Sequence, residues 1–245
     1  MNKRILVMLL IFSCLFSAGC NKKEHTDTEE VKSNFADIGD FNIVEEADEM
    51  QPENYADYIK KCAKYYYNYI DVGDYTNITY SIRRNASDTD DSYADRKFDA
   101  IYEIISNNSD IKSYPKDIYE YLISTLGKNI NDEYQQYKEE NQSFIGYLHD
   151  EYGFNSIDDF DTWSESYTQN YLEQMMIIYI IAFENKITIN EEDIKNEGDK
   201  QAEIYNYSGY EEIISQYGNE MNTELGYQVL YQHVKEFLIS IAINE

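Results

Sequence analysis

The chain has 245 residues, of which 47 are acidic and 20 are basic, so its net charge is −27 at neutral pH. A charge of this sign repels phosphate groups, which argues against nucleic acid as a partner and against direct contact of the protein surface with anionic lipids. Aromatic residues make up 15% of the chain and include 26 tyrosines, so the chain can build packed cores. With two prolines and ten glycines, long uninterrupted helices are expected.

The first twenty residues have the pattern of a secretory signal. Lys3 and Arg4 precede an apolar run over residues 5–16, which is too short for the ~20 residues of a membrane-spanning helix. The small residues before Cys20 resemble the lipobox of bacterial lipoproteins. This resemblance implies that residues 1–19 are removed, that Cys20 is lipidated, and that the protein is extracytoplasmic and anchored to the cell membrane. A plain signal peptide without lipid attachment is the alternative.

The segment after the signal is polar and acidic. We interpret residues 20–51 as a lipid-anchored tether and residues 52–245 as the folded domain. About thirty flexible residues span roughly 30 Å root-mean-square, enough to hold a domain clear of the lipid headgroups. Once the signal and Cys20 are accounted for, Cys62 is the remaining cysteine, so no internal disulfide is expected.

The folded region begins with elements of mixed type. Residues 53–70 can form a short helix or an extended lead-in, and residues 74–82 alternate with β-branched and aromatic enrichment, which predicts a strand. A polar loop over residues 85–93 follows. The next helix ends at residues 107–109, and its apolar positions share one face: Phe98, Ile101, Tyr102 and Ile105.

The second half of the chain is helical in period and repeats a pattern. Pro115 begins a helix, where its missing N–H costs nothing. Residues 143–153 and 208–218 have the same length, and each begins with a serine suited to an N-cap and ends with a glycine suited to a helix stop. Each lies between longer helices, so we interpret two copies of a long–short–long helical arm, with chance similarity of two capped helices as the alternative.

Three stretches resemble trigger factor and its SurA-type extracytoplasmic relatives. Residues 69–78 (YIDVGDYTNI) are similar to the family's lead-in strand before the prolyl-isomerase domain, and residues 101–115 (IYEIISNNSDIKSYP) are similar to the exit segment after it. Residues 181–194 and 230–238 are similar to the ends of the family's C-terminal helical domain. The resemblance covers residues 69–245. It implies a mainly α fold, an elongated helical chaperone body with two helical arms and one short strand-like lead-in segment.

We expect this chain to lack two domains that the family carries. Only residues 83–95 lie where the family carries an FKBP-like isomerase domain, too few for an aromatic-lined proline pocket, so we expect no catalytic residues and no enzyme activity. The signal and tether replace the ribosome-binding domain. The resemblance therefore implies an extracytoplasmic, lipid-anchored chaperone for unfolded or secreted polypeptides, acting in protein folding and transport without ATP or cofactor.

Aromatic side chains in the first arm are the candidate substrate-binding residues. Tyrosine provides a large amphipathic contact area at low entropic cost, so surfaces lined with it can hold unfolded chains loosely. Ordinary packing is the alternative for each candidate. The candidates are Tyr134, Tyr137, Phe144, Tyr147, Trp163 and Tyr167.

Other motifs predict no chemistry. Asp88, Asp90, Ser92 and Asp99 have EF-hand-like spacing, but Tyr93 occupies the position that needs glycine, which favours a solvated acidic loop. The three histidines are far apart in the sequence, and no metal-ligand spacing occurs. We therefore predict no metal site, and we expect Cys62 to be packed on a helix face.

Two other functional classes were weighed against the chaperone. A solute- or ligand-binding cell-surface lipoprotein would have a deep pocket and alternating strands and helices, and the sequence lacks that alternation. An isomerase-foldase would need a domain for which the chain has no room.

Overall fold

The computed structural model describes residues 55–138, 142–218 and 220–245, and these residues form eight helices joined by short segments. The fold of the described residues is mainly α, as the sequence predicted. The helices are α2 (Tyr55–Tyr66), α3 (Asp90–Asn108), α4 (Lys116–Tyr137), α5 (Phe144–Tyr152), α6 (Ile157–Glu184), α7 (Glu191–Ile204), α8 (Tyr210–Tyr217) and α9 (Glu220–Ile241), and the two-residue strands are β1 (Ile70–Asp71), β2 (Thr79–Tyr80), β3 (Asp110–Ile111) and β4 (Ile243–Asn244).

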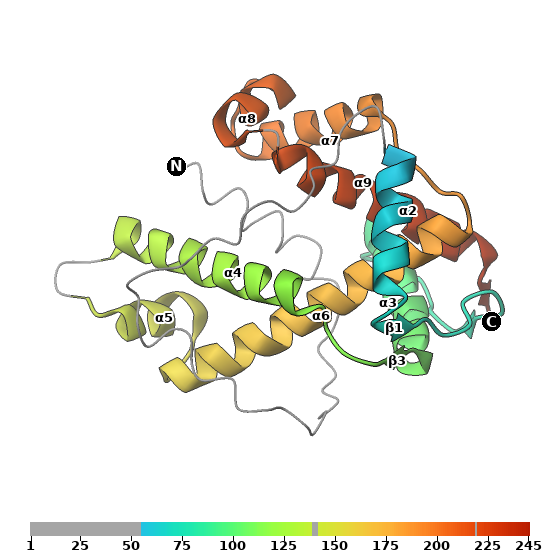
Figure 1. Ribbon diagram of the computed structural model, residues 1–245, viewed down its shortest axis with the longest axis horizontal. Helices are drawn as coiled ribbons and strands as arrows, with labels where there is room; N and C mark the ends of the chain where they lie inside the picture. Colours follow the sequence, from blue (N-terminus) through green and yellow to red (C-terminus); the bar gives the residue numbers. More distant parts are fainter. Residues whose placement is uncertain (1–54, 139–141, 219) are drawn as a thin grey trace. The chain divides into compact units, whose positions relative to one another are not determined.

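The described residues belong to two compact units, and α6 contributes to both of them. The small unit, Pro115–Leu172, holds α4, α5 and the first part of α6, which lie side by side in Figure 1. The large unit, residues 55–114 and 173–245, holds the rest of α6 and the other helices.

The core of the large unit is built around the second part of α6. Residues 176–182 (MIIYIIA) are apolar on every side of the helix, and each is at most 2% exposed. A helix that is apolar all round is stable only when it is covered all round. The ring of Tyr179 lies 5.8 Å from that of Tyr66 on α2 and 5.9 Å from that of Tyr227 on α9, so helices from distant parts of the chain contact the same residue.

The segment at residues 53–70, which the sequence left open, contains helix α2 over Tyr55–Tyr66. Its inner face repeats at helical spacing and is buried. The extended alternative therefore does not hold for the described part of this segment. The buried residues of α2 are Tyr55, Ile59, Ala63 and Tyr66.

The strand predicted over residues 74–82 is shorter than expected. Only β2 forms ladder bonds, and it pairs in parallel with β4 at the far end of the chain. Asp74 Oδ1 accepts hydrogen bonds from the backbone N of Thr76 at 2.8 Å and from its Oγ1 at 2.7 Å. Local bonds of this kind compete with strand pairing, so the stretch begins as a turn. The sequence did not predict the antiparallel pair β1–β3 or β4.

Helix ends agree with the sequence where side-chain caps decide them. Ser143 Oγ accepts a hydrogen bond from Gly146 N at 3.1 Å, and Gly153 ends α5 with a φ of 79°. The helix predicted to end at residues 107–109 ends at Asn108. At its other end α3 begins at Asp90, inside the predicted loop.

The start of α3 is set by a reciprocal cap. Thr89 Oγ1 accepts a hydrogen bond from Ser92 N at 3.1 Å, and Ser92 Oγ accepts one from Thr89 N at 2.9 Å. This capping box satisfies two N-terminal donors, so the helix extends into the polar stretch that composition had assigned to a loop.

The second predicted cap is wrong. Gly209 occupies the N-cap position of α8, while Ser208 donates from N and Oγ to Glu212 Oε2 at 2.7 and 2.8 Å. The predicted glycine stop at Gly218 is confirmed, with a φ of 82°. The long–short–long order is present in both arms, with helices of 22, 9 and 28 residues in the first and 14, 8 and 22 in the second.

Glu224 on α9 is a carboxyl group packed within the large unit. Burial raises its pKa to about 7. Its negative charge also raises the pKa of the Tyr58 phenol on α2. Burial is the largest cause of that increase, followed by Cys62 and then Glu224. The carboxyl therefore loses its proton, at a cost to the folded state, near physiological pH.

We expect Glu224→Gln to stabilise the protein above pH 7. The folded-state pKa lies above the ordinary 4.5, so the folded chain binds more protons than the unfolded chain between these values, and the free energy of unfolding falls as pH rises through this window. The amide removes the cost, with a gain on the order of 1–3 kcal/mol at pH 8. Denaturant unfolding at pH 5 and pH 8 measures it.

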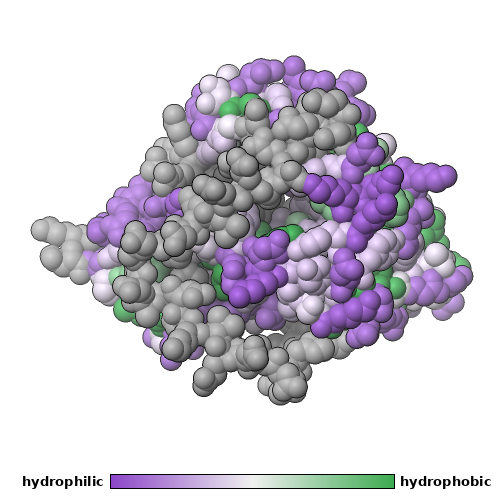
Figure 2. Space-filling view, in the orientation of Figure 1, coloured by the Kyte–Doolittle hydropathy of each residue, from purple (hydrophilic) through white to green (hydrophobic). Residues whose placement is uncertain are grey.

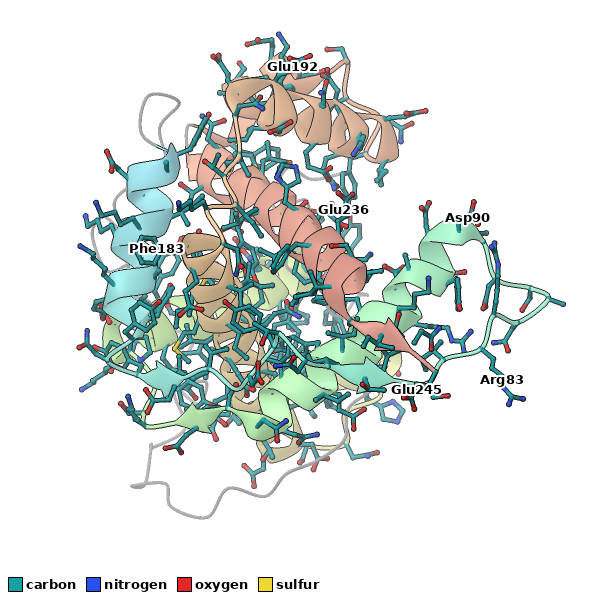
Figure 3. All side chains as sticks on the ribbon, turned by 90° about the vertical axis from the view of Figure 1, so that its right-hand side faces the viewer. Arg83, Asp90, Phe183, Glu192, Glu236 and Glu245 are labelled. Atoms are coloured by element: carbon teal, nitrogen blue, oxygen red, sulfur yellow. The ribbon has the colours of Figure 1, made fainter. Side chains whose placement is uncertain are left out.

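The control is Glu236→Gln, which changes an exposed carboxylate on the same helix (Figure 3). If the two variants respond equally to pH, the partly buried position of Glu224 does not govern this part of the pH dependence.

Candidate functional site

All six aromatic residues that the sequence proposed for substrate binding lie in the small unit. Tyr137, the last residue of α4, is 46% exposed. The other five belong to one network of neighbouring rings drawn from three helices. These are Tyr134 on α4, Phe144 and Tyr147 on α5, and Trp163 and Tyr167 on α6.

The network begins where α4 meets α5. The ring centroid of Tyr134 lies 5.3 Å from that of Phe144 and 5.6 Å from that of Tyr147. Tyr134 Oη also donates to the carbonyl of Gln142 at 2.8 Å, which holds the chain at the start of α5. Ring pairs in such tilted and edge-on arrangements stabilise by about 0.5–1.5 kcal/mol beyond their buried area.

Phe160 on α6 joins the two halves of the network. It is fully buried, and its ring lies 6.3 Å from that of Phe144 and 6.0 Å from that of Trp163. Trp163 in turn lies 5.1 Å from Tyr167, one turn further along the helix. The rings of α6 are therefore held by those of α5 through a buried residue.

Phe154 is a member of the network that the sequence reasoning missed. It follows the left-handed turn at Gly153, and its ring lies 5.5 Å from Phe160 and 5.3 Å from Trp163. Hydrophobic residues directly after a helix-ending glycine commonly pack back against the structure before it. The Gly-Phe pair was the signal that could have identified it.

The candidates differ in how much of them solvent can reach. Tyr147 is only 2% exposed, whereas Tyr134, Phe144, Trp163 and Tyr167 are half-buried. The half-buried rings and the exposed Tyr137 can contact a second chain directly. Tyr147 supports them from inside.

Acidic groups surround the network. Residues 115–172 contain 12 acidic and three basic residues, so this stretch carries a strong negative charge. At the start of α6, burial and the charge of Asp161 raise the pKa of Glu165. Tyr152 Oη donates to Glu133 Oε2 at 2.6 Å, and burial followed by this bond raises the pKa of the phenol. The small unit thus combines apolar ring faces with a negative field.

Two of the EF-hand-like carboxylates form ion pairs. Asp88 Oδ2 lies 2.6 Å from Arg96 Nη1, and Asp90 Oδ1 lies 2.6 Å from Arg84 Nη2. Among the described residues, no group of three His, Cys, Asp or Glu side chains is placed to hold a metal ion.

Cys62 lies half-buried on α2. Burial raises the pKa of its thiol to about 11, so the thiol stays protonated at neutral pH and is a poor nucleophile. Cys20, the signal segment and the tether lie outside the described residues. No helix within the described ranges combines the length and apolarity needed to cross a bilayer.

Comparison with known protein families gives one match. A family model described as "Bacterial trigger factor protein (TF) C-terminus" matches residues 82–240, which include the whole small unit and helices α3 to α8 in full. No curated protein and no solved structure matches the chain.

We expect Phe160→Ala to destabilise the small unit by about 3–5 kcal/mol, because it removes a fully buried ring from the middle of the network. Trp163 is the one tryptophan of the chain, so its emission reports unfolding of this unit. Tyr137→Ala removes an exposed ring of the same unit and serves as the control, with a change of about 0.5 kcal/mol or less. Equal unfolding midpoints for the two variants, followed by Trp163 emission, would contradict the central role of Phe160.

Proposed function

Because the chain belongs to the family of bacterial trigger factor C-terminal domains, a chaperone-type family, we propose that it is an extracytoplasmic, lipid-anchored chaperone that binds unfolded or secreted polypeptides. The observation that carries this proposal is the aromatic network of the small unit, which lies inside the matched residues and is surrounded by acidic groups. Such a protein would act in protein folding and transport without ATP or cofactor.

The exposed parts of the network suit weak and reversible binding. Four half-buried rings and the exposed Tyr137 are spread over three helices, so an extended client can make several contacts at once. At about 0.5–1.5 kcal/mol for each aromatic pair, contacts to all five rings contribute about 2.5–7.5 kcal/mol, less than the roughly 8 kcal/mol of a micromolar complex. Clients bound this weakly dissociate without an energy source.

The negative field gives the binding surface a preference among clients. With 12 acidic and three basic residues, the small unit attracts cationic segments and keeps a complex soluble. The field reaches only about 8 Å at physiological ionic strength. We therefore propose that cationic clients are held more firmly at low salt than at high salt.

The proposed function does not include prolyl isomerisation. Nine residues, 81–89, join β2 to α3 at the position where the family's isomerase domain would stand. The matched domain of the family is of the chaperone type rather than a catalytic one. We propose that the protein holds its clients without altering their peptide bonds.

We expect the protein to suppress aggregation of a denatured secreted protein at near-stoichiometric ratio and without ATP. Replacing the half-buried pair Trp163 and Tyr167 by serine should reduce this protection several-fold, because both rings lose their contact surface. Light scattering measures the protection, and circular dichroism checks that the variant is folded.

The matched control is Thr162→Ala with Ser166→Ala, two exposed polar positions beside the rings on the same helix, which should keep full protection. A wild-type protein that protects none of several clients would show that the family's fold is present without its holding activity.

We expect lipid attachment at Cys20. Radiolabelled fatty acid should enter the wild type and the Cys62→Ala variant but not the Cys20→Ala variant, because only Cys20 follows the signal directly. Incorporation of the label into the Cys20→Ala variant would refute lipid attachment at Cys20. The chaperone proposal would then still be tested separately by the aggregation assay.

A further inference from the structure

Helix α2 carries positive charge in a strongly negative chain. Its 12 residues include three lysines, Lys60, Lys61 and Lys64, and one acidic residue, Asp57. All four of these side chains are exposed. In Figure 2 hydrophilic side chains stand out over this helix.

The lysines share one face of α2, which we call the lysine face. At 3.6 residues per turn, Lys60, Lys61 and Lys64 fall within about a third of the helix circumference. This sector lies opposite the buried residues, which centre on Ile59 and Ala63. Figure 3 shows side chains of α2 projecting away from the rest of the large unit.

Three contacts fix the orientation of the lysine face. The ring of Tyr58 lies 6.3 Å from that of Tyr179, and the ring of Tyr66 lies 5.8 Å from it. At the end of the helix, Tyr67 Oη donates to Glu184 Oε1 at 2.9 Å. Because α2 is held against α6 through Tyr58 and through the residues at its end, its lysines point outward as a set.

The position of α2 in the chain brings this face within reach of the membrane. Tyr55 follows Cys20 by 35 residues, and this chain length limits how far helix α2 can lie from an anchored Cys20. The first described helix can therefore reach the lipid whenever Cys20 is anchored.

We propose that the lysine face of α2 binds the headgroups of anionic phospholipids and orients the large unit on the membrane. The proposal rests on the lipid anchor of the proposed function, and it revises the expectation that the protein surface avoids anionic lipid. The partner follows from charge complementarity, because phosphate-bearing headgroups form an extended negative plane that a set of outward lysines matches.

Magnitudes allow this contact in spite of the net charge of −27. Each basic residue near an anionic surface favours the bound orientation roughly fivefold, so the two net charges of α2 favour it roughly 20- to 30-fold. Acidic groups more than about 8 Å from the headgroups are screened at physiological ionic strength. The contact is too weak to hold a free protein and sufficient to orient one that a lipid already holds.

Amine labelling of the full-length, lipid-bearing protein tests the proposal. The protein is reconstituted on vesicles of phosphatidylcholine alone and of phosphatidylcholine with phosphatidylglycerol, and a water-soluble amine reagent is quantified at each lysine by mass spectrometry. We expect labelling at Lys60, Lys61 and Lys64 to fall several-fold on the anionic vesicles. Lys195 and Lys200, which are exposed on α7, should label equally on both and provide the internal control.

Charge-reversal variants sharpen the test. Lys60→Glu with Lys64→Glu should abolish the protection of Lys61 on anionic vesicles, whereas Lys195→Glu with Lys200→Glu, which changes the net charge equally, should preserve it. High salt should also remove the protection, because it screens the attraction.

Three outcomes would overturn the proposal. Equal labelling of the α2 lysines on both vesicle types would show that the face does not meet anionic lipid. Protection already present on neutral vesicles would show that another part of the chain covers it. Failure of the protein to float with neutral vesicles would refute the anchor itself, a result distinct from the other two and from the aggregation assay.

Discussion

Helix α6 must bury every side of residues 176–182, and the large unit is built to meet that requirement. Fully burying a methionine or isoleucine side chain stabilises by about 1.5–3 kcal/mol, so each of the five such side chains in this stretch contributes more than a surface ion pair at about 0–1 kcal/mol. Tyr179 shows how the requirement is met, because its ring packs against rings from α2 and from α9. In a chain with 47 acidic residues, apolar packing around one helix determines this part of the fold.

The same helix changes character towards its start. Over residues 157–172 it no longer has apolar residues on all sides, and it contributes Phe160, Trp163 and Tyr167 to the aromatic network of the small unit. Here burial is complete for Phe160 and partial for the other two. A network supported from inside and partly open outside can bind apolar segments without losing its own structure. Its acidic surroundings reduce self-association, because like charges repel.

Sequence reasoning identified the features that depend on neighbouring residues. The end of α3, the cap at Ser143 and the stops at Gly153 and Gly218 follow from local backbone chemistry, and all four are present. Features that depend on residues far away in the sequence could not be predicted in the same way. The length of β2 depends on β4, more than 160 residues away.

The candidate site illustrates the same division between local and distant causes. The aromatic residues of the first arm gave six candidates, but their spacing in the sequence does not distinguish the buried Tyr147 from the half-buried Trp163. It also passed over Phe154, which lies outside any helix and is drawn into the network by the turn at Gly153. Burial is set by three helices together, so it becomes visible only when they are assembled.

The central claim is that unfolded polypeptides bind at the aromatic network of the small unit. The most direct measurement is a titration of Trp163 emission with an unfolded, cationic polypeptide that itself lacks tryptophan. We predict a saturable change in emission that weakens as salt is added and that is absent with a folded protein of the same charge. Suppression of aggregation with no change in Trp163 emission would place the clients elsewhere on the protein and contradict the account.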